Sequence, residues 1–188
     1  LGPGSMPVSV LFNNTGTVNV QAGTLQLSGG SNITNTGSFS GNPAATLQFS
    51  GFSYTLGDTS SISIGHVSFS GAIVTVGGSY QVTGSTTIGG TVTFPVTGTL
   101  LSLGDTLTVN GTANFNNDEP INVSNFSLSG GTANFNTGQP VTVNTLNQTG
   151  GFLAGSDTLT VTGTATWSSG YMQGGGRTHT DGGLNITG

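Results

Sequence analysis

Charge is the property that this chain has least of. Only 4% of its 188 residues are charged, with one Lys or Arg against six Asp and Glu, whereas a typical domain carries about 25%. Nucleic-acid binding rests on cationic contacts to phosphate, so this composition excludes a nucleic-acid partner, and it disfavours an anionic membrane surface for the same reason. No run of about 20 apolar residues occurs, so we expect no segment to insert into a membrane as a helix.

Cysteine is absent altogether. Its absence excludes a disulfide framework and any Cys-ligated metal site, and no motif indicates another metal site or a cofactor. A helical fold is disfavoured as well, because no segment keeps apolar residues at the i, i+3, i+4 and i+7 spacing and glycine interrupts every window.

What the chain has instead is glycine, at 34 residues, together with Thr, Val and Ile throughout. β-Branched residues suit a pleated, half-buried surface, while Gly, Asn and Asp are typical of turns. The composition therefore predicts an all-β protein.

The sequence repeats itself over residues 112–131 and 132–151. The two stretches, TANFNNDEPINVSNFSLSGG and TANFNTGQPVTVNTLNQTGG, share their first five and last two residues. In the first copy the apolar residues fall in three alternating pairs, and alternation places both members of a pair on one face of a strand. The pairs are Ala113 and Phe115, Ile121 and Val123, and Phe126 and Leu128. Each repeat therefore predicts three very short strands.

Three such strands cannot form a core alone, but stacked units can if each strand pairs in parallel with its equivalent one unit away. The sequence thus predicts a parallel β-helix of about eight or nine coils of roughly 20 residues, right-handed because parallel crossovers strongly prefer that hand. A β-sandwich would also contain short strands with turn signals. It does not require neighbouring strand sets to share sequence at a regular step, so we favour the β-helix.

The phase of the repeat extends beyond the two clear copies, because TLQFSG at 46–51 and HVSFSG at 66–71 have the same spacing. In both stretches the second inward-pointing residue is a Phe. When this position is followed from one repeat to the next, it predicts a single row of side chains that point into the core. A longer turn would absorb the step of 25 from Phe69 to Phe94, and a further coil would lie around Phe152 or Leu153. The row comprises Leu27, Phe49, Phe69, Phe94, Phe115, Phe135 and Trp167.

The two ends of the chain suggest its organisation. Residues 1–5, LGPGS, look like the remnant of a cleaved purification tag. Residues 6–188 should form a single β-helix segment. Because residues 183–188, GLNITG, stop in mid-pattern without a polar cap, we expect this segment to have been excised from a longer repeat protein.

Three Gly-, Thr- and Asn-rich stretches carry a resemblance to known proteins: FNNTGTVNVQAGTLQLSGG at 12–30, SGGTANF at 129–135 and SDTLTVTGTATWSSGYMQGGG at 156–176. They resemble the repeats of large bacterial extracellular β-helix proteins, which include autotransporter passengers and filamentous-haemagglutinin-like adhesins. The resemblance implies a secreted or cell-surface bacterial protein and a structural role as a rigid stalk or adhesin scaffold. Surface glycans or neighbouring copies of the chain would be its partners. Exposed strand edges at the ends predict end-to-end association of the isolated segment.

Two alternative functions stay open. One is a carbohydrate-binding or polysaccharide-cleaving β-helix module, and the other is a building block of a fibre or a surface layer. Cleaving acidic sugars needs a base together with cationic groups or a metal, which a chain with a single Arg and no Lys assembles poorly. We therefore predict no catalytic residues and no enzymatic activity.

Three aspartates occur in related settings, Asp58 in LGDTSSISIG, Asp105 in LGDTLTVNG and Asp157 in GSDTLTVTG. Stacked at one corner, they would form an acidic ladder for a divalent cation or a sugar. Their spacings of 47 and 52 residues are not multiples of the repeat. Because Asp commonly begins a turn by accepting bonds from backbone N–H groups, we favour that interpretation.

Asp118 and Glu119 are adjacent acids, and the next repeat has Gly138 and Gln139 in their place. A glycosidase needs two carboxylates that face each other across the substrate, whereas neighbours on an extended chain point in different directions. The replacement therefore indicates a solvent-facing turn.

The stretch RTHTD concentrates the ionisable residue types of the chain. Arg177, His179 and Asp181 alternate and so share one face of the predicted strand. We interpret them as a solvated face. His66 should point outward from HVSF and have no function.

The remaining candidates are aromatic or hydroxyl side chains. Trp167, Tyr171 and Met172 could stack on a sugar ring, although Trp167 is in phase with the inward row and should be buried. Tyr171 and Tyr80 stay candidates for surface aromatics. The alternating threonines from Thr158 to Thr166 would form an ice-binding ladder only if they recurred in every coil, so we interpret them as strand formers.

Overall fold

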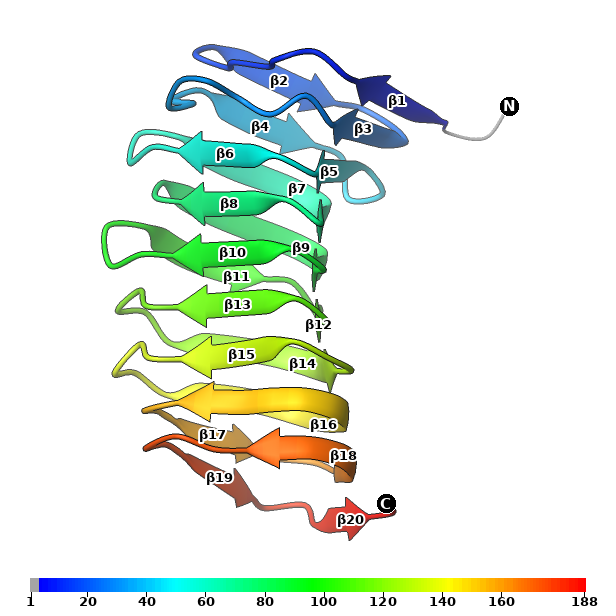
Figure 1. The fold of residues 1–188 in the computed structure, drawn as a ribbon, viewed down its shortest axis with the longest axis vertical. Coiled ribbons are helices and arrows are strands. Elements are labelled where there is room, and N and C mark those ends of the chain that lie inside the picture. The colour runs from blue at the N-terminus through cyan, green and yellow to red at the C-terminus, as the bar shows by residue number, and fades with distance from the viewer. Residues whose placement is uncertain (1–3) are drawn as a thin grey trace.

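Short parallel strands wind around one axis in the computed structural model, which describes residues 4–188 (Figure 1). Twenty strands and no helix occur in this part of the chain, and they form about nine turns of roughly 20 residues. In Figure 1 the strands in front run to the left and those behind run back to the right as the chain descends, which makes the coil right-handed. The structure thus confirms the predicted all-β parallel β-helix, with the hand that parallel crossovers prefer.

Each turn has three faces, which we number in chain order. Face 1 comprises β2 (Thr17–Val20), β4 (Ser38–Gly41), β11 (Thr99–Leu103), β17 (Thr158–Val161), β19 (Arg177–Thr180) and the starts of β7 (Ser61–Ser70), β9 (Ser79–Ile88), β14 (Ile121–Leu128) and β16 (Val141–Gly155). Face 2 comprises β1 (Ser5–Val8), β3 (Thr24–Leu27), β5 (Thr46–Ser50), β12 (Thr106–Val109), β20 (Leu184–Ile186), the later parts of β7, β9 and β14, the middle of β16 and the start of β18 (Ala165–Met172). Face 3 comprises β6 (Ser53–Leu56), β8 (Ile73–Val76), β10 (Thr91–Phe94), β13 (Thr112–Phe115), β15 (Thr132–Phe135) and the ends of β16 and β18.

The first three residues of the proposed tag remnant lie outside the described residues, and Ser5 begins β1. Among residues 4–188 there is no helix with the length and apolar character needed to cross a membrane.

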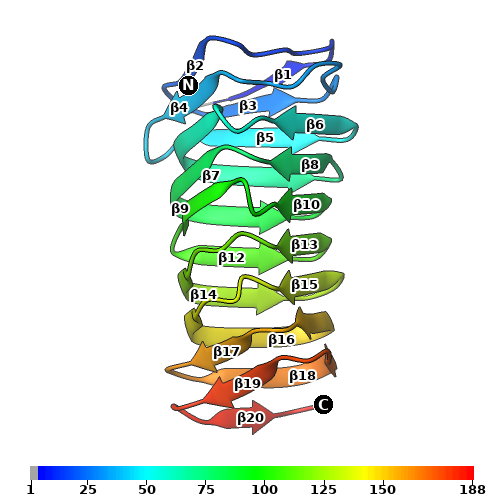
Figure 2. The same cartoon turned by 90° about the vertical axis from the view of Figure 1, so that its left-hand side faces the viewer.

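The strand register explains why the sequence repeats. β13 pairs in parallel with β15, so that Thr112 lies beside Thr132 and Phe115 beside Phe135. β14 pairs with β16 in the same way, with Ile121 beside Val141. Each residue of one copy therefore lies next to its equivalent one turn later, and Figure 2 shows the turns lying directly below one another.

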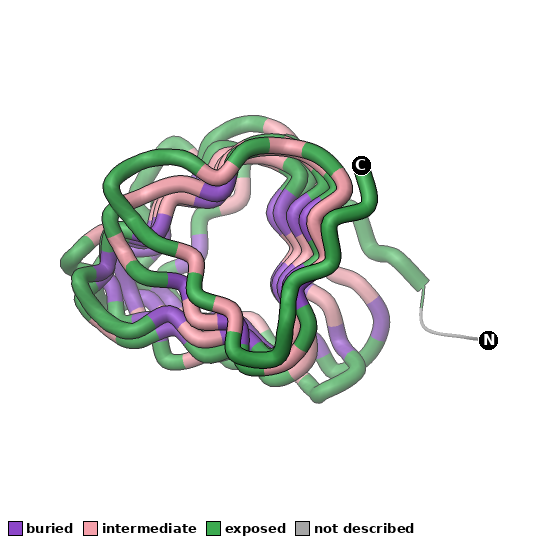
Figure 3. Tube along the Cα trace, turned by 90° about the horizontal axis from the view of Figure 1, so that it is seen from below, coloured by how far each residue is buried: buried purple, intermediate pink, exposed green. Residues whose placement is uncertain are grey.

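Inward side chains from all three faces fill the interior of the stack, and Figure 3 shows the buried positions superposed from turn to turn. Aromatic rings form two stacked columns within this core. On face 2 the rings of Phe49 and Phe69 are 5.5 Å apart. On face 3 the ring of Phe115 lies 5.3 Å from Phe94 and 5.0 Å from Phe135, with nearly parallel planes. In these two columns the core repeats one side chain at one position in successive turns.

The single inward row predicted from the sequence is wrong, because it joins two faces. Phe69 lies on face 2, where the next residue in register is Ile88. Phe94 lies on face 3, where it is followed in register by Phe115. The step of 25 residues is therefore a change of face and not a longer turn.

The later part of that row is also corrected. A coil does occur at Leu153, as predicted, and it places Leu153 in register with Ala133. Trp167 lies on face 2 in register with Gln148 and Ile186. It is only half-buried, because a single short strand, β20, follows it on this face within the described residues.

Outside the core, polar side chains also stack from turn to turn. Asn134 donates from Nδ2 to Oδ1 of Asn114 at 2.8 Å, and Asn136 donates to Asn116 at 3.4 Å. Stacked amides of this kind add side-chain bonds to the backbone ladder, as they do in other in-register stacks. They tie the turn of β13 to the turn of β15 at the surface as well as in the core.

Candidate functional site

The three aspartates do not form a ladder. Asp58 is exposed in the turn between β6 and β7, and Asp157 lies before β17, so both occupy the corner from face 3 to face 1 but are several turns apart. Asp105 lies exposed between β11 and β12, at the corner from face 1 to face 2. Because Asp105 lies at another corner and Asp58 and Asp157 are several turns apart, these carboxylates cannot hold one cation or one sugar together.

Asp157 instead fastens two successive turns. Its carboxylate accepts hydrogen bonds from the backbone N–H groups of Thr137 and Gly138 and from the Thr137 hydroxyl, at 3.0 Å for Gly138 N and 2.8 Å for Thr137 Oγ1. Hydrogen bonds to an ionised carboxylate are shorter and stronger than neutral ones. Asp157 therefore accepts bonds from backbone N–H groups, as predicted, but these groups belong to the turn of the preceding coil and not to the turn that Asp157 itself begins.

The adjacent acids Asp118 and Glu119 point in different directions, as expected, and lie in different surroundings. Asp118 is exposed, whereas Glu119 is half-buried and its Oε2 accepts from Asn117 Nδ2 at 3.1 Å. The Leu100 N–H also donates to Glu119 at 3.4 Å. Glu119 thus supports the turn after β13 and does not face Asp118 across a cleft.

The ionisable residues of RTHTD lie on the outside of β19 and just after it. Arg177 and His179 are exposed on one face, as predicted, and His179 Nε2 lies 2.8 Å from Asp181 Oδ1. Both partners of this pair are more than half exposed, so it contributes little to stability. His66 points outward, with Nδ1 at 2.8 Å from Ser85 Oγ.

Metal-ligating side chains do not gather anywhere within residues 4–188. No three His, Asp or Glu side chains of this part of the chain come close enough to hold an ion. The alternating threonines do not form one array either, since Thr158 and Thr160 lie on face 1, in β17, and Thr166 lies on face 2, in β18.

Tyr80 is not a surface aromatic. Its side chain is fully buried, and its hydroxyl lies 2.9 Å from Thr86 Oγ1. Burial raises the pKa of Tyr80 far above its ordinary value, although the hydrogen bond to Thr86 acts in the opposite direction. Tyr80 therefore remains a protonated phenol inside the core, and its role is structural.

A pair of outward aromatic rings lies on face 3. Tyr171 is 64% exposed, as the sequence allowed, and its ring stacks on that of Phe152 at 5.4 Å with planes 13° apart. We call Phe152 and Tyr171 the outer aromatic pair. Sequence reasoning missed Phe152 as a surface residue because Phe and Leu are adjacent at 152–153, and only the register shows that Leu153 is the inward one. Met172 packs against the core and does not join the pair.

A shallow polar groove of about 330 Å³ runs along the corner between faces 1 and 2. Successive turns contribute Thr83, Asp105, Ser124, Asn144 and Thr162 to its lining. These side chains are exposed, and a carboxylate, amides and hydroxyls can exchange hydrogen bonds with an uncharged polar ligand such as a sugar. No aromatic side chain lines this groove.

The outer aromatic pair and the polar groove lie on different parts of the surface, and the structure does not unite them in one site. No family model, curated protein or solved structure matches the chain.

Proposed function

We propose that this chain is a stiff structural segment, a stalk or adhesin scaffold, of a bacterial protein that is secreted or displayed on the cell surface. The observation that carries the proposal is the uninterrupted stacking of about nine turns on a shared core. The resemblance of the repeats to those of bacterial extracellular β-helix proteins supports the location. In this role the chain performs no catalysis and needs no cofactor.

The stack has the physical properties of a spacer. Its length grows by one inter-strand spacing per turn, about 4.8 Å, so nine turns span roughly 40 Å. Backbone ladders on the three faces tie each turn to the next. Stacked aromatic rings in the core, such as Phe115 and Phe135, and the Asn114–Asn134 bond outside it add to this between individual turns. In a repeat structure, stability grows with the number of such interfaces, so length can be adjusted by whole turns.

Removing one whole turn tests this modularity. Deletion of residues 132–151 joins Gly131 to Phe152, which already occupies the register position of Thr132. We expect the shortened chain to keep cooperative unfolding and to lose about 4.8 Å of length, measured by small-angle X-ray scattering and circular dichroism.

Deletion of residues 132–141 provides the matched control. It removes half a turn and misaligns every following strand, so we expect it to abolish the folded state of the turns beyond it. A chain that tolerated both deletions equally, or neither, would contradict a spacer assembled from interchangeable turns.

A carbohydrate-binding module is the second candidate, favoured by the outer aromatic pair. Exposed aromatic rings supply apolar area, and Tyr adds a hydroxyl that can form a hydrogen bond, which is why Tyr is enriched at binding surfaces. If this candidate holds, a screen against bacterial, plant and animal polysaccharides should find a ligand whose binding Tyr171→Ala reduces at least about tenfold, or about 1.4 kcal/mol.

Ile73→Ala is the control for that screen, because Ile73 is an equally exposed apolar residue on the same face at 58% but lies several turns away. Specific binding that depends on Tyr171 and not on Ile73 would replace the spacer proposal. No binding by the folded chain would reject the carbohydrate candidate.

A further inference from the structure

Face 2 carries two columns of outward polar side chains that run along the stack. The longer column extends from Gln26 to Asn185 and consists of Gln, Ser, Thr and Asn alone, with one residue from each successive turn. The shorter column extends from Thr24 to Thr145 and adds one His, His66, to residues of the same kinds. Only the register between turns brings these residues side by side, because each turn contributes them from a different short segment, such as TLQF or TLTV.

Face 2 is also regular in its geometry. Its strands pair in parallel from β1 to β20 with no register shift inside the face, and Figure 3 shows them nearly superposed on its right-hand side. On face 1, by contrast, the register shifts within β11 between Leu100 and Ser102. Neighbours within a column of face 2 are therefore one inter-strand spacing apart, about 4.8 Å, and the two columns are two residues apart, about 6.6 Å.

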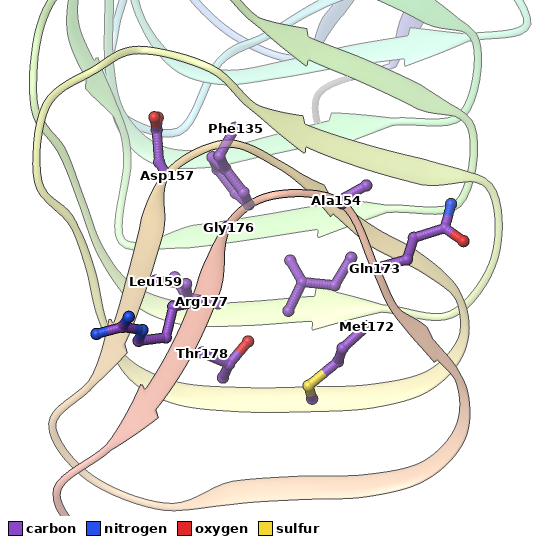
Figure 4. A pocket seen from close by; sticks show the side chains of 11 residues that line it. Phe135, Ala154, Asp157, Leu159, Met172, Gln173, Gly176, Arg177 and Thr178 are labelled. Carbon is purple, nitrogen blue, oxygen red and sulfur yellow. The ribbon is translucent and has the colours of Figure 1, made fainter.

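Charged side chains are confined to face 1 and the corners in the part of the chain that the structure describes. Six of them are acids and the seventh is Arg177. Figure 4 shows Asp157 and Arg177 beside an open hollow of about 120 Å³ where face 3 meets face 1. Face 3 is uncharged as well, but Ile73 and the outer aromatic pair interrupt its outward surface with apolar groups. Face 2 is thus the face that presents a regular, uncharged array of hydrogen-bonding groups.

We propose that face 2 is an adsorption surface for ice, a function that goes beyond the spacer role and does not depend on it. Hydroxyl and amide groups donate and accept hydrogen bonds, as water does. Repeats of about 4.8 Å along the stack and about 6.6 Å along the strands are close to the distances between rows of water oxygens on the faces of an ice crystal. Side chains at these distances can take the places of water molecules at the crystal surface. The recurrence in every turn that an ice-binding ladder requires is met here by residues of different segments, and not by the run from Thr158 to Thr166.

The array is held in place before it meets a ligand. His66 Nδ1 lies 2.8 Å from Ser85 Oγ in the next turn, and Thr145 Oγ1 donates to Asn125 Oδ1 at 2.9 Å. Threonine side chains are stiff at χ1 as well, because they branch at the β-carbon. Groups that are already ordered lose little conformational entropy on binding, so many weak contacts to a rigid crystal can add up.

A crystalline polysaccharide is a less suitable partner for this face. Its sugar rings present apolar faces, for which aromatic side chains are the usual partners. The two columns contain no Phe, Tyr or Trp, and the outer aromatic pair lies on face 3. The chemistry of face 2 therefore favours water as the crystal that it contacts.

Thermal hysteresis, the gap between the melting and freezing temperatures of a single ice crystal, tests the proposal with the full chain. We expect the gap to widen with protein concentration, the crystal to grow facets, and recrystallisation of fine-grained ice to slow. A folded chain that shows neither hysteresis nor slower recrystallisation would overturn the proposal. Adsorption to microcrystalline cellulose without any effect on ice would also overturn it, and would assign the face to a polysaccharide.

Two matched variants locate the surface. Thr108 on β12 of face 2 and Thr142 on β16 of face 1 are both half-buried, outward threonines inside a strand. Thr108→Arg should lower the hysteresis at least about tenfold, because a charged side chain would lose its water against an uncharged surface, whereas Thr142→Arg should leave it unchanged. If circular dichroism shows that Thr108→Arg does not fold, Thr87→Arg replaces it, one turn earlier in the same column. Equal hysteresis in the folded variants of the two faces would refute the assignment to face 2.

Discussion

Replacing Phe115 by Asp should leave the chain without a stable folded state. Phe115 is completely buried, with its ring between those of Phe94 and Phe135. Aspartate would place an unpaired carboxylate in the middle of this column. The effective cost of burying such a charge is several kcal/mol, the lost packing of a core Phe adds about 3–5 kcal/mol, and a typical domain has only about 5–15 kcal/mol of stability. Circular dichroism with a urea titration will measure the loss.

Asp118→Asn is the companion variant for that measurement, because Asp118 is an exposed residue three positions away. We expect it to change the free energy of unfolding by no more than about 0.5 kcal/mol, as surface substitutions usually do. Phe115→Ala should fall between the two, since it removes the ring without introducing a charge. A folded, cooperative Phe115→Asp chain would mean that the assigned phase of face 3 is wrong.

Gly131→Ala should cause the second large loss, through the backbone. Gly131 ends the SGG sequence of the first repeat and has a φ of 59°, a left-handed conformation that costs other residues about 1–2 kcal/mol. A β-carbon at this position would also overlap the carbonyl oxygen of Gly111 in the preceding turn. That oxygen accepts the N–H of Thr132 at 2.8 Å, so making room for the methyl group breaks the register at the start of β15.

Gly138→Ala separates the two causes of that loss. Gly138 has a similar φ of 67°, but a β-carbon there would meet nothing within 4 Å. We expect it to lose only the conformational contribution, about 1–2 kcal/mol, while Gly131→Ala loses clearly more. Equal losses in urea unfolding would show that the close approach of Gly131 to Gly111 does not limit the stacking distance.

The paired copies at 112–131 and 132–151 were sufficient to predict the architecture. In a parallel stack each residue's main neighbour is its own equivalent one turn later, as Phe135 is for Phe115. Neighbours in space are then related by a constant step along the chain. The all-β class, the turn of roughly 20 residues and the three strands per turn could all be read from this regularity.

The regular repeat in the sequence did not show on which of the three faces each residue lies. All three faces show the same alternation of inward and outward residues, and the distance between equivalent residues varies, so Phe69 is followed on face 2 by Ile88 rather than by Phe94. A pattern of period two indicates that a residue points inward but not toward which face. This ambiguity produced the false row, and it concealed Tyr80 in the core and Phe152 on the surface.

The sequence by itself determined the repeating unit of this protein, because local alternation and turn residues dictate what each 20-residue stretch can form, as in TANFNTGQPVTVNTLNQTGG. Only the tertiary structure decided where particular side chains meet. The corners that separate Asp105 from Asp58 and Asp157, the bonds from Asp157 to the preceding turn, and the end of the face 3 aromatic column where Gly155 follows Phe135 all depend on the register between turns. That register is set by the summed packing of many neighbours along the stack, which no single stretch of sequence contains.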